Sequence, residues 1–320
     1  MSSTTQTRFL IISDTHGHTF PPEIMPFAPV DVLIHCGDLT HHSKMDEYRQ
    51  TLTMLKAFKA SRTLVIAGNH DFSLDTVAFK AKIEQANRIY GSPLEADLVE
   101  REFGGLKVYA SPYTPSSSSS ERWGFSYNES EGHVFDIKTD TDIVITHGPP
   151  RGIMDISADQ KRIGFSDLCA AVAKSQPRLH CFGHVHGGWG AKNVAWRPQI
   201  SDRPSHFGDI DHGKSEVIDD LTTLGGTQFE SEEDKITGEG KLERHRWQRC
   251  CSAGYTRAHS SWSEPKSTMF VNAALEANGE LQRFPWIIDI DLPRGEICMA
   301  SKTEGKRKRE ESYRSKGTIG

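Results

Sequence analysis

The sequence predicts an α/β fold, and three observations support this prediction. Five short apolar runs have the length of strands and are rich in branched residues, which is typical of strands buried on both faces of a sheet. Amphipathic segments with helical spacing lie between these runs, so strands and helices alternate along the chain. Each run also ends in a cluster of polar residues and glycine. The runs are Phe9–Ile12, Val32–Ile34, Leu64–Ala67, Ile143–Ile145 and Leu179–Phe182.

Three segments between the runs are predicted to be helices. The first has one apolar face, because its apolar residues recur at intervals of three and four. Residues 79–90 repeat this pattern and end at Gly91, a typical helix stop. The third begins near Ser166-Asp167, which are suited to cap a helix, and ends before Pro177. The apolar residues of the first helix are Met45, Tyr48, Leu52, Leu55 and Phe58.

Composition argues against several classes of partner. The chain has 320 residues and a net charge of -5, which gives no support for nucleic-acid binding. No stretch approaches the ~20 apolar residues that a membrane span needs, and the N-terminus has no secretory signal. The six cysteines show no framework spacing, which favours a reducing compartment. We therefore expect a protein of the cytoplasm or nucleus that has no membrane partner.

The polar clusters supply a set of side chains that suits metal ions. In parallel α/β sheets, residues just past the carboxyl ends of strands converge in space. Oxygen and imidazole ligands without thiolate suit Mn, Fe, Zn or Mg rather than a closed structural zinc site. Seven ligands are too many for one tetrahedral ion but fit two ions that share a carboxylate, the usual clamp for displacement at phosphorus. The residues are Asp14, His16, Asp38, Asn69, His147, His184 and His186.

Each cluster alone has a plainer interpretation. A single Asp-x-His after a strand is most often a turn and a cap, and a paired histidine is most often a satisfied surface group. Gly183-His184-Val185-His186-Gly187 is the most specific piece. Five such clusters, in this order and at five strand ends, are very improbable by chance, so we interpret the set as a site of metal catalysis.

These clusters resemble the calcineurin-like metallophosphoesterase family. Its pattern of Asp-x-His, Gly-Asp, Gly-Asn-His-Glu/Asp, His and Gly-His-x-His is present in full. The resemblance is closer to the metallophosphoesterase-domain-containing branch, which is related to class III cyclic-nucleotide phosphodiesterases. The stretches that carry it include residues 31–40, 65–70, 123–125, 146–150, 178–186 and 270–273.

The resemblance implies a four-layer α/β/β/α sandwich with a dinuclear centre in which manganese is favoured. Asp38 would bridge the two ions, and a hydroxide between them would attack the phosphorus. One ion would be held by Asp14, His16, Asp38 and His186, and the other by Asp38, Asn69, His147 and His184.

Two further residues are assigned catalytic roles by the resemblance. His70 would face the phosphate, either to stabilise developing charge or to protonate the leaving oxygen. Asp71 would orient His70, and a helix N-cap is an equally weighted alternative. His41 and His42 are interpreted as solvated, with the mouth of the site as the alternative. Trp123 is interpreted as loop packing, with stacking on a nucleobase as the alternative.

The resemblance covers residue 8 to about 190 and resumes from about 268. Residues 1–191 are therefore predicted to form the first part of the core, and residues 268–293 the strands that complete it. Residues 192–267 are polar, glycine-dotted and weakly periodic, which predicts a partly disordered insertion. Residues 294–320 are predicted to be a charged flexible tail.

The function expected from these features is hydrolysis of a phosphoester, most closely that of a phosphodiesterase with cyclic nucleotides as candidate substrates. A phosphomonoesterase acting on nucleotides or phosphoproteins is the first alternative. A regulatory protein that binds nucleotide and turns it over slowly is the second. The full set of ligands favours an enzyme. The partner is then a small phosphoester, and the sequence does not indicate an oligomeric state.

Overall fold

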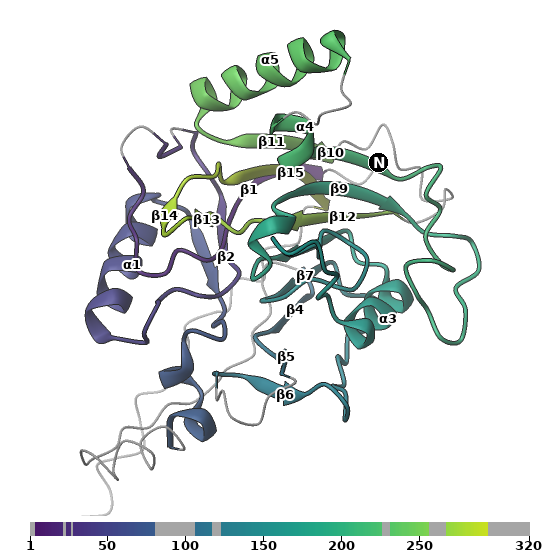
Figure 1. The fold of residues 1–320 in the computed structure, drawn as a ribbon, viewed down its shortest axis with the longest axis horizontal. Helices are drawn as coiled ribbons and strands as arrows, with labels where there is room; N and C mark the ends of the chain where they lie inside the picture. Colours follow the sequence, from purple (N-terminus) through teal and green to yellow (C-terminus); the bar gives the residue numbers. More distant parts are fainter. Residues whose placement is uncertain are drawn as a thin grey trace, which may run out of the picture.

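Two β-sheets face each other in the centre of the molecule (Figure 1). The computed structural model describes residues 4–21, 24–26, 28–80, 106–116, 123–225, 231–255 and 267–293. Most of the predicted second helix, residues 117–122 with most of the serine run, and the tail 294–320 lie outside these ranges.

The first sheet has the strand order β11-β15-β1-β2-β3. β1, β2 and β3 run parallel, so their carboxyl ends share one edge of the sheet. β15 pairs antiparallel with β1, and β11 pairs parallel with β15. The strands are β1 (Thr4–Ile12), β2 (Val32–His35), β3 (Arg62–Val65), β11 (Cys251–Tyr255) and β15 (Trp286–Pro293).

The second sheet has the order β10-β9-β12-β8-β7-β4. β4, β7, β8 and β12 are parallel, whereas β9 is antiparallel to both β12 and β10. The strands are β4 (Val108–Ser111), β7 (Ile143–Thr146), β8 (Leu179–Phe182), β9 (Gly190–Ala195), β10 (Glu216–Asp220) and β12 (Ser267–Asn272).

Successive side chains along a strand point to opposite faces, so each sheet has one face toward the other sheet and one face outward. On β1, Phe9 and Ile11 belong to the core between the sheets, whereas Leu10 and Ile12 face the other way. The outward face of the first sheet packs against α1 (Met45–Ala57) through Met54.

The outward face of the second sheet is covered in the same way by α3 (Ser166–Ser175), whose Leu168 and Val172 cluster with Phe182 and Phe270. The predicted four-layer α/β/β/α sandwich is confirmed.

Shorter elements complete the description. They are η1 (Phe72–Leu74), β5 (Thr114–Ser116), β6 (Ser126–Asn128), η2 (His186–Gly188), α4 (Leu221–Gly225), α5 (Glu232–Gln248), β13 (Glu276–Ala277) and β14 (Glu280–Leu281). Within the described ranges, no helix has the length and apolar character needed to cross a bilayer.

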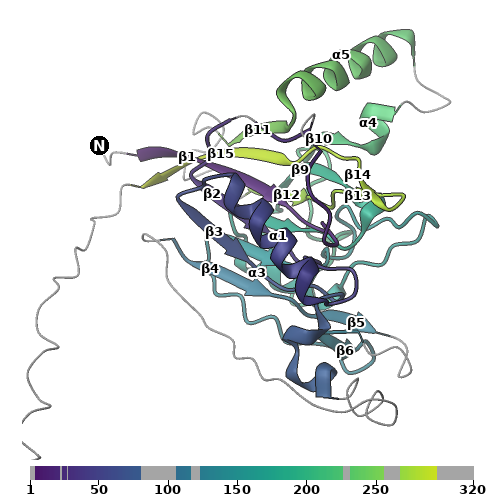
Figure 2. The same ribbon diagram turned by 90° about the vertical axis from the view of Figure 1, so that its left-hand side faces the viewer.

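Residues 192–267 differ from the expectation of a separate insertion. They contain most of β9 and all of β10 and β11, so the segment contributes strands to both sheets. Trp196 and Ile210 are buried in the core beside α3. These strands are short, and β9 and β10 carry polar residues at consecutive positions, Lys192-Asn193 and Asp219-Asp220, so they show no clear alternation in the sequence. Figure 2 shows α5 at one end of the sandwich, above β10 and β11.

Candidate metal centre

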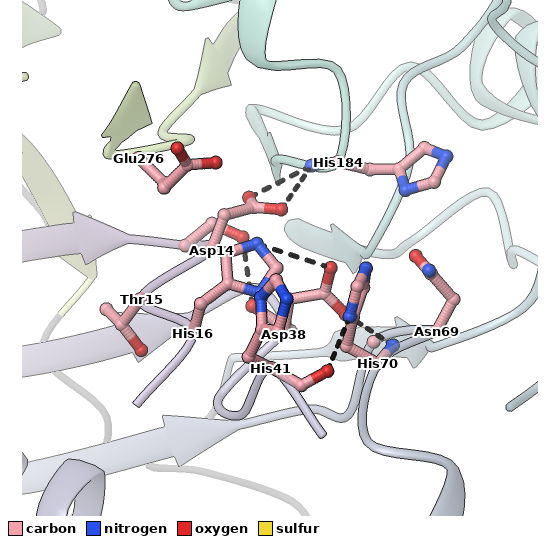
Figure 3. A network of polar contacts seen from close by, with 12 residues as sticks. Asp14, Thr15, His16, Asp38, His41, Asn69, His70, His184 and Glu276 are labelled. Carbon is pink, nitrogen blue, oxygen red and sulfur yellow. Dashed lines mark hydrogen bonds and ion pairs between the residues drawn. The ribbon is translucent and has the colours of Figure 1, made fainter. Parts of the chain in front are cut away.

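All seven candidate ligands lie just beyond the carboxyl ends of five parallel strands, three in one sheet and two in the other. Asp14 and His16 follow β1, Asp38 follows β2, and Asn69 follows β3. His147 follows β7, and His184 and His186 follow β8. The two sheets therefore bring their loops together at one edge of the sandwich. Figure 3 shows Asp14, Asp38 and His184 from these loops close to one another.

The backbone is held in the left-handed region at four of these residues. The φ values are 54° at Asp14, 48° at His16, 54° at Asp38 and 64° at His184. Residues other than glycine rarely adopt this conformation, and such strain is concentrated at functional sites. The loops thus hold a strained backbone conformation at these residues, and this conformation directs their side chains into the site.

The first group of candidate ligands consists of Asp14, His16 and His186, whose ligand atoms lie within 4.8 Å of one another. Asp14 is fully buried, and both of its carboxylate oxygens accept from the backbone N–H of His184, at 3.0 and 3.1 Å. Its Oδ1 lies 3.4 Å from His186 Nε2.

The second group consists of Asp38, His147 and His184, again with ligand atoms within 4.8 Å. Asn69 joins this group, because its Oδ1 lies 2.9 Å from His147 Nε2. His147 and His184 are neighbours, with ring centroids 4.9 Å apart. The four residues are the set predicted to hold the second ion.

Asp38 lies between the two groups. Its Oδ2 is 3.8 Å from His16 Nε2, and its Oδ1 is 3.4 Å from His147 Nε2. Oδ1 also accepts from the backbone N–H of His70 at 2.8 Å. One oxygen therefore faces each group, which is the geometry required of a bridging carboxylate.

Three imidazoles are anchored through Nδ1 and point Nε2 into the site. His16 Nδ1 lies 3.2 Å from the carbonyl oxygen of Thr40, and His147 Nδ1 lies 3.0 Å from that of Cys36. His186 Nδ1 lies 2.8 Å from the Glu276 carboxylate. An oxygen partner at Nδ1 fixes the proton there and leaves a lone pair on Nε2, as in most metal-ligating histidines.

The two buried carboxylates of the site, Asp14 and Asp38, need positive charge nearby. Burial alone would raise the pKa of Asp38, but the charge of a protonated His147 and its hydrogen bond lower it to about 2, and a cation bound at Nε2 would supply the same positive charge. For Asp14, burial is likewise outweighed by the hydrogen bond and charge of His186, so its pKa lies well below the usual range. Two buried carboxylates in one site are stable only when cations compensate them.

Glycines make room for these close approaches. A Cβ on Gly68 would lie 2.2 Å from Asp38 Oδ1 and 2.6 Å from His147 Cε1. A Cβ on Gly183 would lie 2.1 Å from Asp14 Oδ2. Together with the two buried carboxylates and the three inward Nε2 atoms, this arrangement fits two divalent cations.

His70 lies at the mouth of the site, outside both groups. Its Nδ1 lies 2.8 Å from the carbonyl oxygen of His41, so its Nε2 is the atom available to a substrate. Its ring is 4.5 Å from that of Trp123 and 4.8 Å from that of His16. Figure 3 shows His16, His41 and His70 gathered together, with Glu276 on the other side of Asp14.

The expectation for Asp71 is wrong in detail. Asp71 is fully buried and accepts hydrogen bonds from Leu39 N, Thr40 N, Thr40 Oγ1 and Gly68 N, at 2.7–3.0 Å. Because the partner of the His70 ring is the His41 carbonyl, Asp71 does not orient that ring, and its side chain caps no helix. Burial raises the pKa of Asp71 to about 6. Its place is to tie the Asp38 loop to the Asn69 loop.

Sequence reasoning missed Glu276, whereas it had named His41 as solvated with the mouth of the site as the alternative. Glu276 lies on the β13–β14 hairpin, and only its contact with His186 gives it significance. His41 belongs to a third group of potential ligands, with His16 and His70, whose atoms lie within 4.8 Å of one another. The histidine pair was visible in the sequence as a pair in a loop, whereas an isolated glutamate carries no local signal.

A comparison with known proteins identifies the family to which this chain belongs. The model of the family described as calcineurin-like phosphoesterase matches residues 7–188, more than half of the chain. The chain belongs to this family. The family uses a dinuclear metal centre, and the matched region holds all seven candidate ligands.

Among curated relatives, the human metallophosphoesterase domain-containing protein 1 is 32% identical over 209 residues, covering 58% of this chain and 62% of that protein. A UPF0046 protein of Caenorhabditis elegans is 29% identical over 217 residues, covering 57% and 52%. A probable rhamnogalacturonate lyase C of Emericella nidulans is 33% identical over 199 residues, covering 59% and 18%. The chain thus spans between 18% and 62% of the length of these relatives.

Among solved structures, a purple acid phosphatase from yellow lupin is similar, with a TM-score of 0.35 and 15% identity. The match covers 62% of this chain and 40% of that one.

Proposed function

We propose that this metallophosphoesterase is a metal-dependent phosphodiesterase with two divalent ions, of which manganese is favoured. The observation that carries the proposal is the position of Asp38, with one oxygen toward each group of ligands. Two groups of ligands that share one carboxylate are typical of the two-metal clamp used for in-line displacement at phosphorus. A site that only binds phosphate would need no such completeness.

The residues of the chain would hold and orient the reactants. The three Nε2 atoms and the two buried carboxylates form a rigid set, because their second contacts are made to backbone or to Glu276. When bound, such a pair of ions neutralises the charge of the phosphate and activates the attacking water. The Asp71 contacts keep the Asp38 and Asn69 loops in register, so both groups retain their spacing.

His70 is the proposed acid for the leaving oxygen. The His41 carbonyl holds Nδ1, so the ring cannot turn freely and Nε2 is the atom left for the substrate. Hydrolysis breaks the bond between phosphorus and an ester oxygen, which leaves as an alkoxide and takes a proton from the acid; general acids of this kind contribute about 10²–10⁴-fold. The Trp123 ring lies 4.5 Å from the same ring, and a tryptophan at this position could stack on a nucleobase. These features favour a nucleotide ester, with cyclic nucleotides as candidates.

An activity screen with Mn²⁺ tests the proposal. The metal-stripped protein is assayed with bis(p-nitrophenyl) phosphate and p-nitrophenyl phosphate, before and after Mn²⁺ is restored, and then with cyclic nucleotides. We expect Mn²⁺-dependent turnover with a higher kcat/KM for the diester. A preference for the monoester would point to the phosphomonoesterase instead.

Two further expectations remain proposals. If neither ester is hydrolysed but calorimetry detects a nucleoside monophosphate binding at fixed Mn²⁺, the chain is a nucleotide-binding regulator. A location in the cytoplasm or nucleus is proposed from the sequence and would be tested by fractionation.

A further inference from the structure

A small hairpin near the end of the described chain touches the candidate metal centre. It is formed by β13 and β14, with Asn278 and Gly279 at its turn in the left-handed region (φ 55° and 81°). The hairpin is tied to the loop that carries Asp14, because Leu275 N donates to Ser13 O at 3.1 Å. Residues 274–283 lie beyond the region matched by the family model, which ends at residue 188.

The hairpin segment holds His186 at two points. The Glu276 carboxylate accepts from His186 Nδ1, with 2.8 Å between Oε2 and Nδ1. Arg283 Nη1 donates to the backbone carbonyl of His186. The Glu276 side chain is only 17% exposed, and its other oxygen accepts from Gly279 N, so its position is fixed by the hairpin itself.

The consequence for His186 follows from the chemistry of imidazole. A proton held at Nδ1 by a carboxylate leaves Nε2 with its lone pair, 3.4 Å from Asp14 Oδ1 and inside the first group. The other two anchored imidazoles, of His16 and His147, rest on backbone carbonyls. Of these three, His186 has the only anionic partner, and a carboxylate orients the ring more strongly and raises its basicity as a ligand.

We propose that Glu276 is a positioning residue for metal binding, which sets the affinity of the first group by fixing the tautomer and orientation of His186. The inference rests on the proposed dinuclear centre. It makes a segment outside the matched family region part of the metal site. Glu276 would touch neither metal nor substrate, so its effect should be confined to one of the two ions.

The test uses the full chain, stripped of metal with a chelator and titrated calorimetrically with Mn²⁺. In Glu276→Ala we expect affinity to fall about 10–100-fold at one of two binding steps, the usual cost of losing such a partner. In Glu276→Gln the loss should be smaller, because the amide oxygen accepts the same hydrogen bond. Glu280→Ala is the matched control, since Glu280 is exposed on the same hairpin, and it should bind both ions as the wild type does.

A second readout separates positioning from general support of the fold. In ¹⁵N-detected spectra, the Nδ1–H signal of His186 should persist in Glu276→Gln and broaden or shift in Glu276→Ala. Thermal unfolding of the metal-free variants should match that of the wild type. Unchanged affinity at both steps in Glu276→Ala, or equal weakening of both steps with a lower melting temperature, would overturn the inference. Failure of the wild type to bind two ions would instead refute the dinuclear centre itself.

Discussion

The two halves of the candidate metal centre differ in how they are held. Asp38, Asn69, His147 and His184 form a half whose central ring, His147, is fully buried and rests on the backbone carbonyl of Cys36. Asp14, His16 and His186 form a half in which the His186 side chain is 30% exposed and rests on Glu276 from a distant hairpin.

The difference teaches that two similar groups of candidate metal ligands can be held by unlike supports. The first-described half depends on loops that follow β2, β3, β7 and β8, all inside the region matched by the family model. The other half needs residues from beyond that region. The His186 imidazole of this half is more exposed than the His147 imidazole of the other half, so solvent competes more with its contacts. We therefore expect the ion of the His186 half to exchange first.

The largest expected effect is that of Asp38→Asn, which should weaken metal binding in both halves at once. Of the seven candidate ligands, Asp38 is the one whose two oxygens face the two halves. An amide supplies no negative charge, so both ions should bind weakly and turnover should fall by at least about 10³-fold, which corresponds to ~4 kcal/mol. Metal analysis and steady-state kinetics measure this. Asp159→Asn, at an exposed position, is the control, and two retained ions with normal turnover would disprove the bridging role.

His70→Ala should affect catalysis without affecting either half. His70 makes its ring contacts with the His41 carbonyl and neighbouring rings, not with the buried carboxylates. We expect wild-type metal content and a kcat lower by about 10²–10⁴-fold. His42→Ala provides an exposed neighbour as control. Loss of a metal ion from the His70 variant would show that His70 is a ligand.

A matched pair of variants tests whether the halves are independent. His184→Gly should weaken the ion of the more buried half, and His186→Gly that of the other, each by about tenfold or more, or ~1.4 kcal/mol. Calorimetric titration with Mn²⁺ resolves the two steps. If both variants lose the same step, the assignment of the two histidines to different ions is incorrect. Binding of a nucleoside monophosphate should persist in His184→Gly, because the other group still offers one cationic centre.

Asp71→Asn should have the smallest effect on turnover and should mainly lower the free energy of unfolding. Its carboxylate accepts four hydrogen bonds from the Asp38 and Asn69 loops. An amide nitrogen placed against backbone donors leaves them unsatisfied, at about 1–3 kcal/mol for each group. Urea unfolding of the metal-free protein measures the loss, with Asp159→Asn as reference. Equal stability of the two variants would mean that the loops do not depend on Asp71.

Much of the fold could be predicted because its signals are local. The apolar runs of β1, β2, β7 and β8 read as strands from their composition alone, and the spacing of Met45–Phe58 gave α1. By contrast, β9, β10 and β11 lie in a stretch predicted to be an insertion. Their backbones become strands through pairing with β12 and β15, and a single sequence does not reveal such long-range partners.

The same division runs through the site. The sequence alone determined the residue types and their order, because each polar cluster follows its strand directly and turns there with glycine. Only the tertiary structure decided which group each ligand joins, that Asp71 ties two loops together, and that Glu276 supports His186. These contacts form when the two sheets close on each other and bring distant segments together. The periodicity of a single sequence does not predict such long-range contacts, because they depend on how the whole core packs.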